Sequence, residues 1–239
     1  MKKIYIITLL FFAFITMQAQ DKTVEKNEKV SFTLGTDFVS SYVWRGAYQT
    51  GFSVQPAMGI DAYGFSLSTW GNTDIADQGF KEVDFTLGYT IAGFSVSITD
   101  YWWMGEGYKN YFKYKNNETD HLFEGTISYA LPMEKFPLSI SWNTMFLGAD
   151  YKVDGNRAYS SYAELSYPFS IKDIDLDVSL GLTPWESLYA NDFAVVNVGI
   201  GASKVLKITD SFSLPVFGKI MTNPESEEIF FVFGFSLGL

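Results

Sequence analysis

The chain has 239 residues, of which 47% are hydrophobic and 18% aromatic, and 17 basic against 27 acidic residues give a formal net charge of −10. It contains no cysteine, which excludes disulfides, thiolate metal sites and a lipid-modified N-terminal cysteine. The acidic balance argues against nucleic acid as a partner, because phosphate backbones attract basic proteins.

The N-terminus has the order of a secretory signal peptide. Met1-Lys2-Lys3 precedes an apolar run over residues 4–15, and small residues follow up to Ala19. The apolar run is shorter than the roughly 20 residues of a membrane-spanning helix. We therefore predict a signal peptide over residues 1–20, a short polar lead over 21–29, and a single domain over 30–239.

The rest of the chain alternates apolar and polar residues with a period of two, which is typical of β-strands. A clear example is residues 82–91, where Val83, Phe85 and Leu87 alternate with Glu82, Asp84 and Thr86. Short turn-forming segments separate the alternating stretches. In chain order, the expected strands are 30–44, 52–61, 65–70, 82–91, 94–99, 123–131, 138–146, 162–169, 174–183, 196–203, 212–220 and 228–239.

The last of these strands indicates how the sheet ends. One face of residues 228–239 carries Phe231, Phe233 and Phe235, and the other carries small residues such as Gly234 and Ser236. An apolar strand at an open edge of a soluble sheet would invite aggregation, whereas a strand that closes a barrel in lipid has no open edge. The alternative is an inner strand of a soluble β-sandwich.

The connections favour the membrane. Those that follow odd-numbered expected strands are the longer set, and those that follow even-numbered strands are mostly short. Bacterial outer-membrane barrels have an even number of strands, short periplasmic turns and longer external loops. We therefore predict an all-β, antiparallel up-and-down transmembrane barrel of about twelve strands in the outer membrane of a Gram-negative cell envelope, with both termini periplasmic.

A family resemblance points the same way. Residues 35–50, which include Asp37, Tyr42 and the Arg45-Gly46 pair, resemble the N-terminal signature of the TorF-like porin family. The similarity continues through residues 55–57, 68–74 and 82–84, and is best over about 31–90. The resemblance implies an outer-membrane porin whose substrate is largely undefined. The chain departs from the usual terminal phenylalanine of barrel assembly signals by ending in Leu239.

The inward parity of the expected strands collects charged residues. The candidate pore-lining residues are Asp37, Arg45, Asp61, Glu82, Asp84, Glu124, Glu164, Asp177 and Lys219. One interpretation is a packed lumen in which Arg45 and Lys219 neutralise nearby acids. The other interpretation is a water-filled path lined by acids, because unpaired carboxylates need water. Carboxylates along such a path would make it prefer cations.

The longest expected loop, 104–120, supplies a candidate constriction. Lys109, Tyr111, Lys113 and Tyr114 are the residues expected to fold inward onto the acidic wall. The alternative is a solvated surface loop.

These patterns leave three functions open. The first is a channel for passive diffusion of small hydrophilic solutes, with outer-membrane lipid and the outer-membrane assembly machinery as further partners. The second is a closed barrel that acts through a surface interaction of the 104–120 loop. The third is a lipid-modifying enzyme with His121, the single histidine, as base, which requires a nucleophile and an orienting group beside it. We expect no enzymatic activity, catalytic residues, cofactor or metal.

Overall fold

The computed structural model describes residues 30–75, 81–103, 109–115, 118–133 and 136–238. The signal peptide and polar lead expected over residues 1–29, and Leu239, lie outside the described residues. Within the described ranges, no helix is long and apolar enough to cross a membrane.

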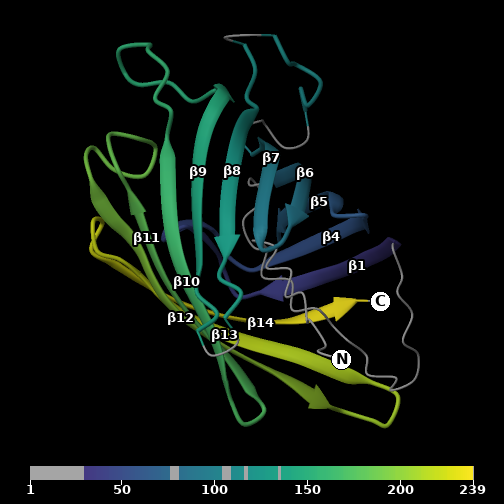
Figure 1. Ribbon diagram of the computed structural model, residues 1–239. Coiled ribbons are helices and arrows are strands. Elements are labelled where there is room, and N and C mark those ends of the chain that lie inside the picture. The colour runs from purple at the N-terminus through teal and green to yellow at the C-terminus, as the bar shows by residue number, and fades with distance from the viewer. Residues whose placement is uncertain (1–29, 76–80, 104–108, 116–117, 134–135, 239) are drawn as a thin grey trace.

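The described chain confirms the predicted fold class, a closed antiparallel barrel of twelve strands (Figure 1). Neighbours in the sequence are neighbours in the sheet, and β1 pairs with both β4 and β14 to close the ring. The barrel strands are β1 (Val30–Val39), β4 (Ser53–Ala62), β5 (Phe65–Asp74), β6 (Lys81–Ile91), β7 (Phe94–Trp102), β8 (Leu122–Ala130), β9 (Ser139–Gly148), β10 (Ser161–Ile171), β11 (Ile174–Thr183), β12 (Ala194–Lys207), β13 (Ser213–Asn223) and β14 (Glu228–Gly238).

The barrel is apolar outside and polar inside. Large apolar side chains point outward along every strand, with Phe32 76% exposed, Phe231 65% and Phe233 59%. Polar side chains such as Asn72, Ser141 and Asn143 are buried inside the ring. This distribution is the reverse of a soluble domain, because its large apolar groups face away from the interior.

Most short connections are tight turns at one end of the barrel. Tyr63-Gly64 and Ala92-Gly93 each have positive φ at both positions, the geometry of a two-residue turn that matches the twist of its strands. The other end carries the longer loops. One connection there departs from the predicted alternation, since only residues 224–227 separate β13 from β14.

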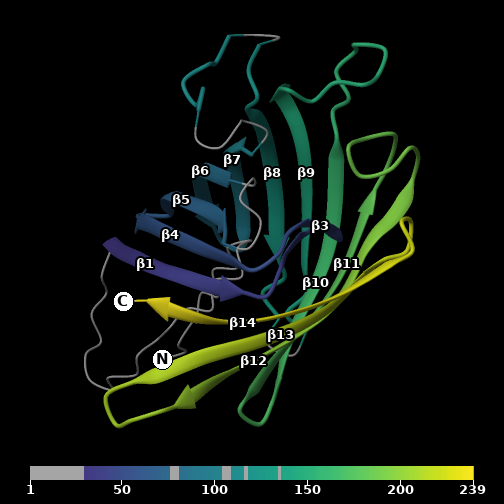
Figure 2. The ribbon, with the colours of Figure 1, turned by 180° about the vertical axis from the view of Figure 1, so that it is seen from behind.

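The structure corrects the first expected strand. Residues 30–44 do not form one strand, because β1 ends at Val39 and the chain then turns inward. Tyr42–Trp44 (β2) and Ala47–Thr50 (β3) pair with each other in a separate two-stranded sheet, called here the inner hairpin, and Figure 2 shows β3 within the ring of strands. The change of direction follows Ser40, whose amide donates the last hydrogen bond of this edge to the Phe233 carbonyl at 2.9 Å.

The tip of the inner hairpin requires glycine. Arg45 and Gly46 have φ values of 51° and 78°, and a Cβ added to Gly46 would lie 1.9 Å from the Val196 carbonyl oxygen of β12. The hairpin therefore reaches into the barrel until its backbone touches β12, which is separated from β1 by β14 and β13.

Replacing Gly46 with alanine should displace the tip, because the added methyl group and the backbone of β12 cannot occupy the same space. We expect a loss of about 1–3 kcal/mol of docking free energy, typical of overpacking. The measurement is the rate of trypsin cleavage after Arg45 in the folded, detergent-solubilised protein. Gly155→Ala is the matched control, since Gly155 has a similar φ of 83° with no atom within 4 Å of the added Cβ. Equal cleavage rates in the two variants would contradict the close contact.

Candidate functional site

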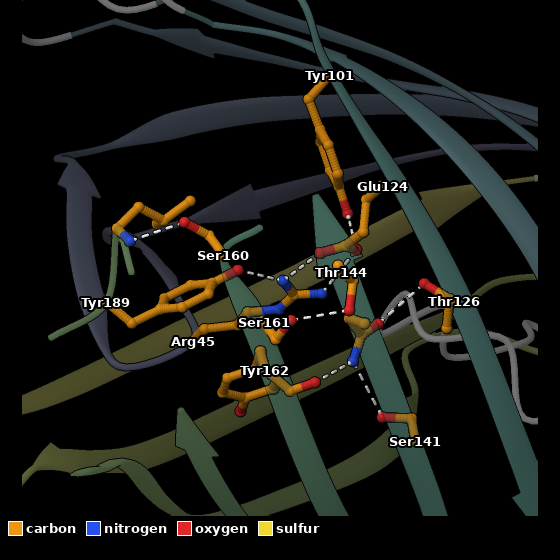
Figure 3. Close-up of polar contacts among 12 residues, drawn as sticks. Arg45, Tyr101, Glu124, Thr126, Ser141, Thr144, Ser160, Ser161, Tyr162 and Tyr189 are labelled. Carbon is orange, nitrogen blue, oxygen red and sulfur yellow. Dashed lines mark hydrogen bonds and ion pairs between the residues drawn. The ribbon is translucent and has the colours of Figure 1, made fainter. Parts of the chain in front are cut away.

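The inner hairpin is held in the lumen by an ion pair between Arg45 and Glu124 of β8 (Figure 3). Arg45 Nη1 donates to Glu124 Oε2 at 2.6 Å, and Nη2 donates to Oε1 at 2.8 Å. The two parallel hydrogen bonds fix both the position and the orientation of the guanidinium group. The Glu124 side chain is 1% exposed and that of Arg45 is 11% exposed, so water screens this pair little.

Aromatic rings surround this ion pair. The Arg45 guanidinium carbon lies 4.4 Å from the Trp44 ring centroid and 4.6 Å from that of Tyr162. Tyr101 donates its hydroxyl hydrogen bond to Glu124 at 3.0 Å, and Tyr189 accepts one from Arg45. Burial raises the pKa of the Tyr189 phenol, which therefore stays uncharged beside the ion pair. The site combines a neutralised charge pair with cation–π contacts, which strengthen in a desolvated setting.

The base of the inner hairpin is attached to the wall near β5 and β6. The rings of Tyr42 and Trp70 lie 5.3 Å apart, and Tyr42 also hydrogen bonds with Glu82. Thr50 donates a hydrogen bond to Asp74 at the end of β5. The hairpin thus spans the lumen, from these contacts to Arg45 against β8 and Gly46 against β12.

The inner hairpin also contacts the β13–β14 side. Tyr48 stacks with Phe230 of β14, with ring centroids 6.4 Å apart. Beside Arg45 the hairpin leaves a cavity of about 190 Å³, lined in part by Trp44, Gln49, Trp103 and Tyr189. The hairpin and its aromatic contacts thus occupy part of the lumen at this level.

The remaining lumen-facing residues line the wall. Asp37 of β1 accepts a 2.6 Å hydrogen bond from Ser236, while Tyr162 and Asn197 donate to Glu164. Asp177 of β11 lies across Gly201 of β12, at which an added Cβ would lie 2.2 Å from Asp177 Oδ1. The predicted pore-lining residues on this wall are Asp37 (β1), Asp61 (β4), Glu82 and Asp84 (β6), Glu124 (β8), Glu164 (β10), Asp177 (β11) and Lys219 (β13).

The described residues of the candidate constriction loop lie outside the lumen. Its described part packs on the outer face of the barrel, where Tyr111 contacts Phe85 and Trp102, and Tyr114 donates to Asp100 at 3.3 Å. Asp100 and Trp102 belong to the outward parity of β7, which also carries the exposed Ile98. Lys109 and Lys113 belong to the same segment, and Lys113 lies 4.0 Å from Glu118. Residues 104–108 and 116–117 lie outside the described residues.

His121 is fully buried beneath this outer loop. Its Nδ1 lies 2.7 Å from Asp100 Oδ1, its Nε2 lies 2.6 Å from the Tyr111 carbonyl oxygen, and its ring stacks on Tyr114 at 4.1 Å. Asp100 occupies the place of an orienting group. The other ring nitrogen faces a backbone carbonyl, where a base would need the hydroxyl of a nucleophile. His121 therefore fixes the loop to the barrel in this structure.

Sequence reasoning identified Arg45 and Glu124 separately but not their contact. It also missed the aromatic partners Tyr101, Tyr162 and Tyr189. The available signal was the Trp44-Arg45-Gly46 sequence, in which a glycine able to take positive φ follows two bulky residues. Among the described residues, no group of three or more His, Asp or Glu side chains is placed to hold a metal ion.

Comparisons with known proteins give alignments of low identity to solved structures. No protein-family model and no curated protein matches the chain, so the resemblance to TorF-like porins stays a prediction. A porin structure aligns at 11% identity with a TM-score of 0.38, over 80% of this chain and 66% of that one. A variant of the Rh. blastica porin aligns at 10% identity with a TM-score of 0.42, over 88% and 100%. The Pseudomonas aeruginosa channel OccK9 (OpdG) aligns at 12% identity with a TM-score of 0.38, over 89% and 64%.

Removing either partner of the ion pair should destabilise the barrel, because the remaining charge is left buried and unpaired. We expect Arg45→Ala and Glu124→Ala each to lower the free energy of unfolding by about 3–5 kcal/mol. The double variant should lose clearly less than the sum, since no lone charge remains. Urea unfolding in detergent, followed by fluorescence of the adjacent Trp44 and Trp103, measures all three. Strictly additive losses would show that the two residues do not interact.

Proposed function

We propose that this chain forms an outer-membrane channel for the passive diffusion of small hydrophilic solutes, and that the inner hairpin sets its width. The observation that carries the proposal is the hairpin itself, which crosses the polar interior of a closed barrel and is fixed by the Arg45–Glu124 ion pair. A twelve-stranded barrel is wider than an eight-stranded one. In an eight-stranded barrel, side chains alone can fill the interior.

The apolar exterior supports the membrane location. Outward side chains such as Leu34, Met58, Leu87 and Ile98 are more than half exposed, and each barrel strand carries exposed large apolar side chains. A surface of this extent is stable in lipid and promotes aggregation in water. The short turns lie at the end of the barrel where β1 begins, which favours a periplasmic position for both termini. Outer-membrane lipid and the barrel assembly machinery are the partners that this location implies.

The charge of the lumen favours cations. The carboxylates of Asp37, Asp61, Glu164 and Asp177 face the interior. Lys219 is a basic residue on the same wall, and the charge of Arg45 is neutralised by Glu124. A permeating ion in so narrow a barrel stays within about one Debye length, ~8 Å, of these acids at physiological salt. Wall carboxylates raise the local concentration of cations and repel anions.

Shortening the inner hairpin should widen the channel. We expect replacement of residues 43–49 by two glycines to raise the single-channel conductance in planar bilayers, because it removes the segment that crosses the lumen. The control is deletion of residues 109–115, the described segment on the outer face, which should leave conductance unchanged. If both deletions have the same effect, the hairpin does not set the width.

Neutralising two half-buried wall acids should weaken cation preference. We expect Asp61→Asn with Asp177→Asn to move the reversal potential in a KCl gradient toward zero, since fewer fixed charges attract potassium. Asp173→Asn, in the exposed β10–β11 turn, is the control and should leave it unchanged. Anion preference of the wild-type channel would refute the assignment.

A closed barrel with a surface role is the second candidate. It is favoured by the tight seating of the inner hairpin and by Phe112 in the outer loop, whose side chain is 88% exposed. Bilayers that show no channel events with the wild type, but regular events after hairpin replacement, would support this alternative.

A further inference from the structure

Two acidic side chains beside the inner hairpin are not explained by the ion pair. Glu82 and Asp84 occupy successive lumen-facing positions of β6 and are 1% and 2% exposed. Asn72 of β5 lies opposite Glu82, and Trp70 of β5 and Tyr101 of β7 lie on either side of Asp84. Both carboxylates are therefore enclosed between the barrel wall and the base of the hairpin.

Each of these carboxylates has an oxygen without a partner. Among the described residues, Glu82 Oε2 and Asp84 Oδ1 are buried and accept no hydrogen bond. Tyr42 and the Trp102 backbone hydrogen bond to the two groups, but neither brings a positive charge. Arg45, on the same hairpin, already has both terminal nitrogens on Glu124.

The surrounding charges aggravate this situation. Glu82 is the nearest charge on the same face of β6, and a charged Glu82 disfavours a charged Asp84. Removing a carboxylate from water without a compensating partner is strongly unfavourable, and two neighbouring carboxylates also repel each other. Such a pair is stable when a positive species lies between the two groups.

We propose that Glu82 and Asp84 together bind one small, oxygen-seeking divalent cation of the Ca²⁺ class. Hard cations prefer carboxylate oxygens, and one divalent ion balances the charge of two carboxylates. Successive lumen-facing positions on one strand place both groups on the same side of the sheet. The site has two acidic ligands, so water supplies further oxygens.

The ion would also secure the inner hairpin. Tyr42 belongs to β2, hydrogen bonds with Glu82 and packs on Trp70, so it covers the proposed site from the hairpin side. Neutralising Glu82 and Asp84 removes the repulsion beneath this contact. Cation binding therefore stabilises the position of the hairpin, at the end opposite to Arg45.

The test is Ca²⁺ binding to the purified, chelator-treated barrel, measured by isothermal titration calorimetry. We expect one saturable site per chain, lost in Glu82→Gln with Asp84→Asn. The matched control is Asp173→Asn with Asp175→Asn, which removes two exposed acids of the same spacing, one from the β10–β11 turn and one from the start of β11. This control should bind as the wild type does. Heat-modifiable migration in gels verifies that each barrel is folded, and Asp84→Asn alone replaces the double variant if that one fails to fold.

Thermal unfolding provides a second readout. Ca²⁺ should raise the Tm of the wild type and the control, and leave that of the Glu82/Asp84 variant unchanged. Unaltered binding in that variant would overturn the proposal, as would a wild type that binds no Ca²⁺ and whose stability responds to pH alone, because protons would then occupy the site. Neither measurement involves conduction, so a barrel that binds Ca²⁺ without conducting would refute the channel and retain the site.

Discussion

Backbone hydrogen bonding constrains this structure more than any side-chain contact. A strand in lipid has no water to satisfy its amide and carbonyl groups, so each strand needs a partner on both sides. The pairing of β1 with β14, from Gly35 opposite Gly238 to Val39 opposite Gly234, closes the ring. Closure also creates an enclosed interior. The inner hairpin can lie in it because β2 and β3 satisfy each other's backbone hydrogen bonds.

The enclosed interior explains why charged residues can hold the inner hairpin. An exposed Arg–Glu pair contributes little to stability because water screens and competes for both groups. Arg45 and Glu124 instead lie among Trp44, Tyr101, Tyr162 and Tyr189, which exclude water and add hydrogen bonds and cation–π contacts. The same exclusion of water leaves Glu82 and Asp84 without compensation. One physical cause therefore produces both a tight ion pair and an unsatisfied acidic pair on neighbouring parts of the wall.

The sequence predicts the barrel well because its main determinant is local. Alternation along each strand decides which side chains face lipid, and this period is legible in segments such as residues 82–91. The inner hairpin was missed because Tyr42, Val43 and Trp44 continue the alternation of β1, and no local signal shows that the chain leaves the sheet after Val39. The partner of Arg45 is 79 residues away, a distance that periodicity does not resolve. The position of the outer loop could not be decided from the sequence, since parity assigns a face only within a strand, and Tyr111 and Tyr114 belong to a loop.

The position of the inner hairpin in the chain has a consequence for how the protein folds. The hairpin lies between the first two barrel strands, yet its tip contacts Glu124, Tyr189 and Val196, and the Arg45–Tyr189 contact joins residues 144 apart. Contacts of such long sequence separation form slowly, because the intervening chain must first be ordered. One of the earliest segments to be synthesised is thus among the last to reach its final position. The hairpin tip can reach its final position only after β8, β12 and the segment between β11 and β12 that carries Tyr189 are in place.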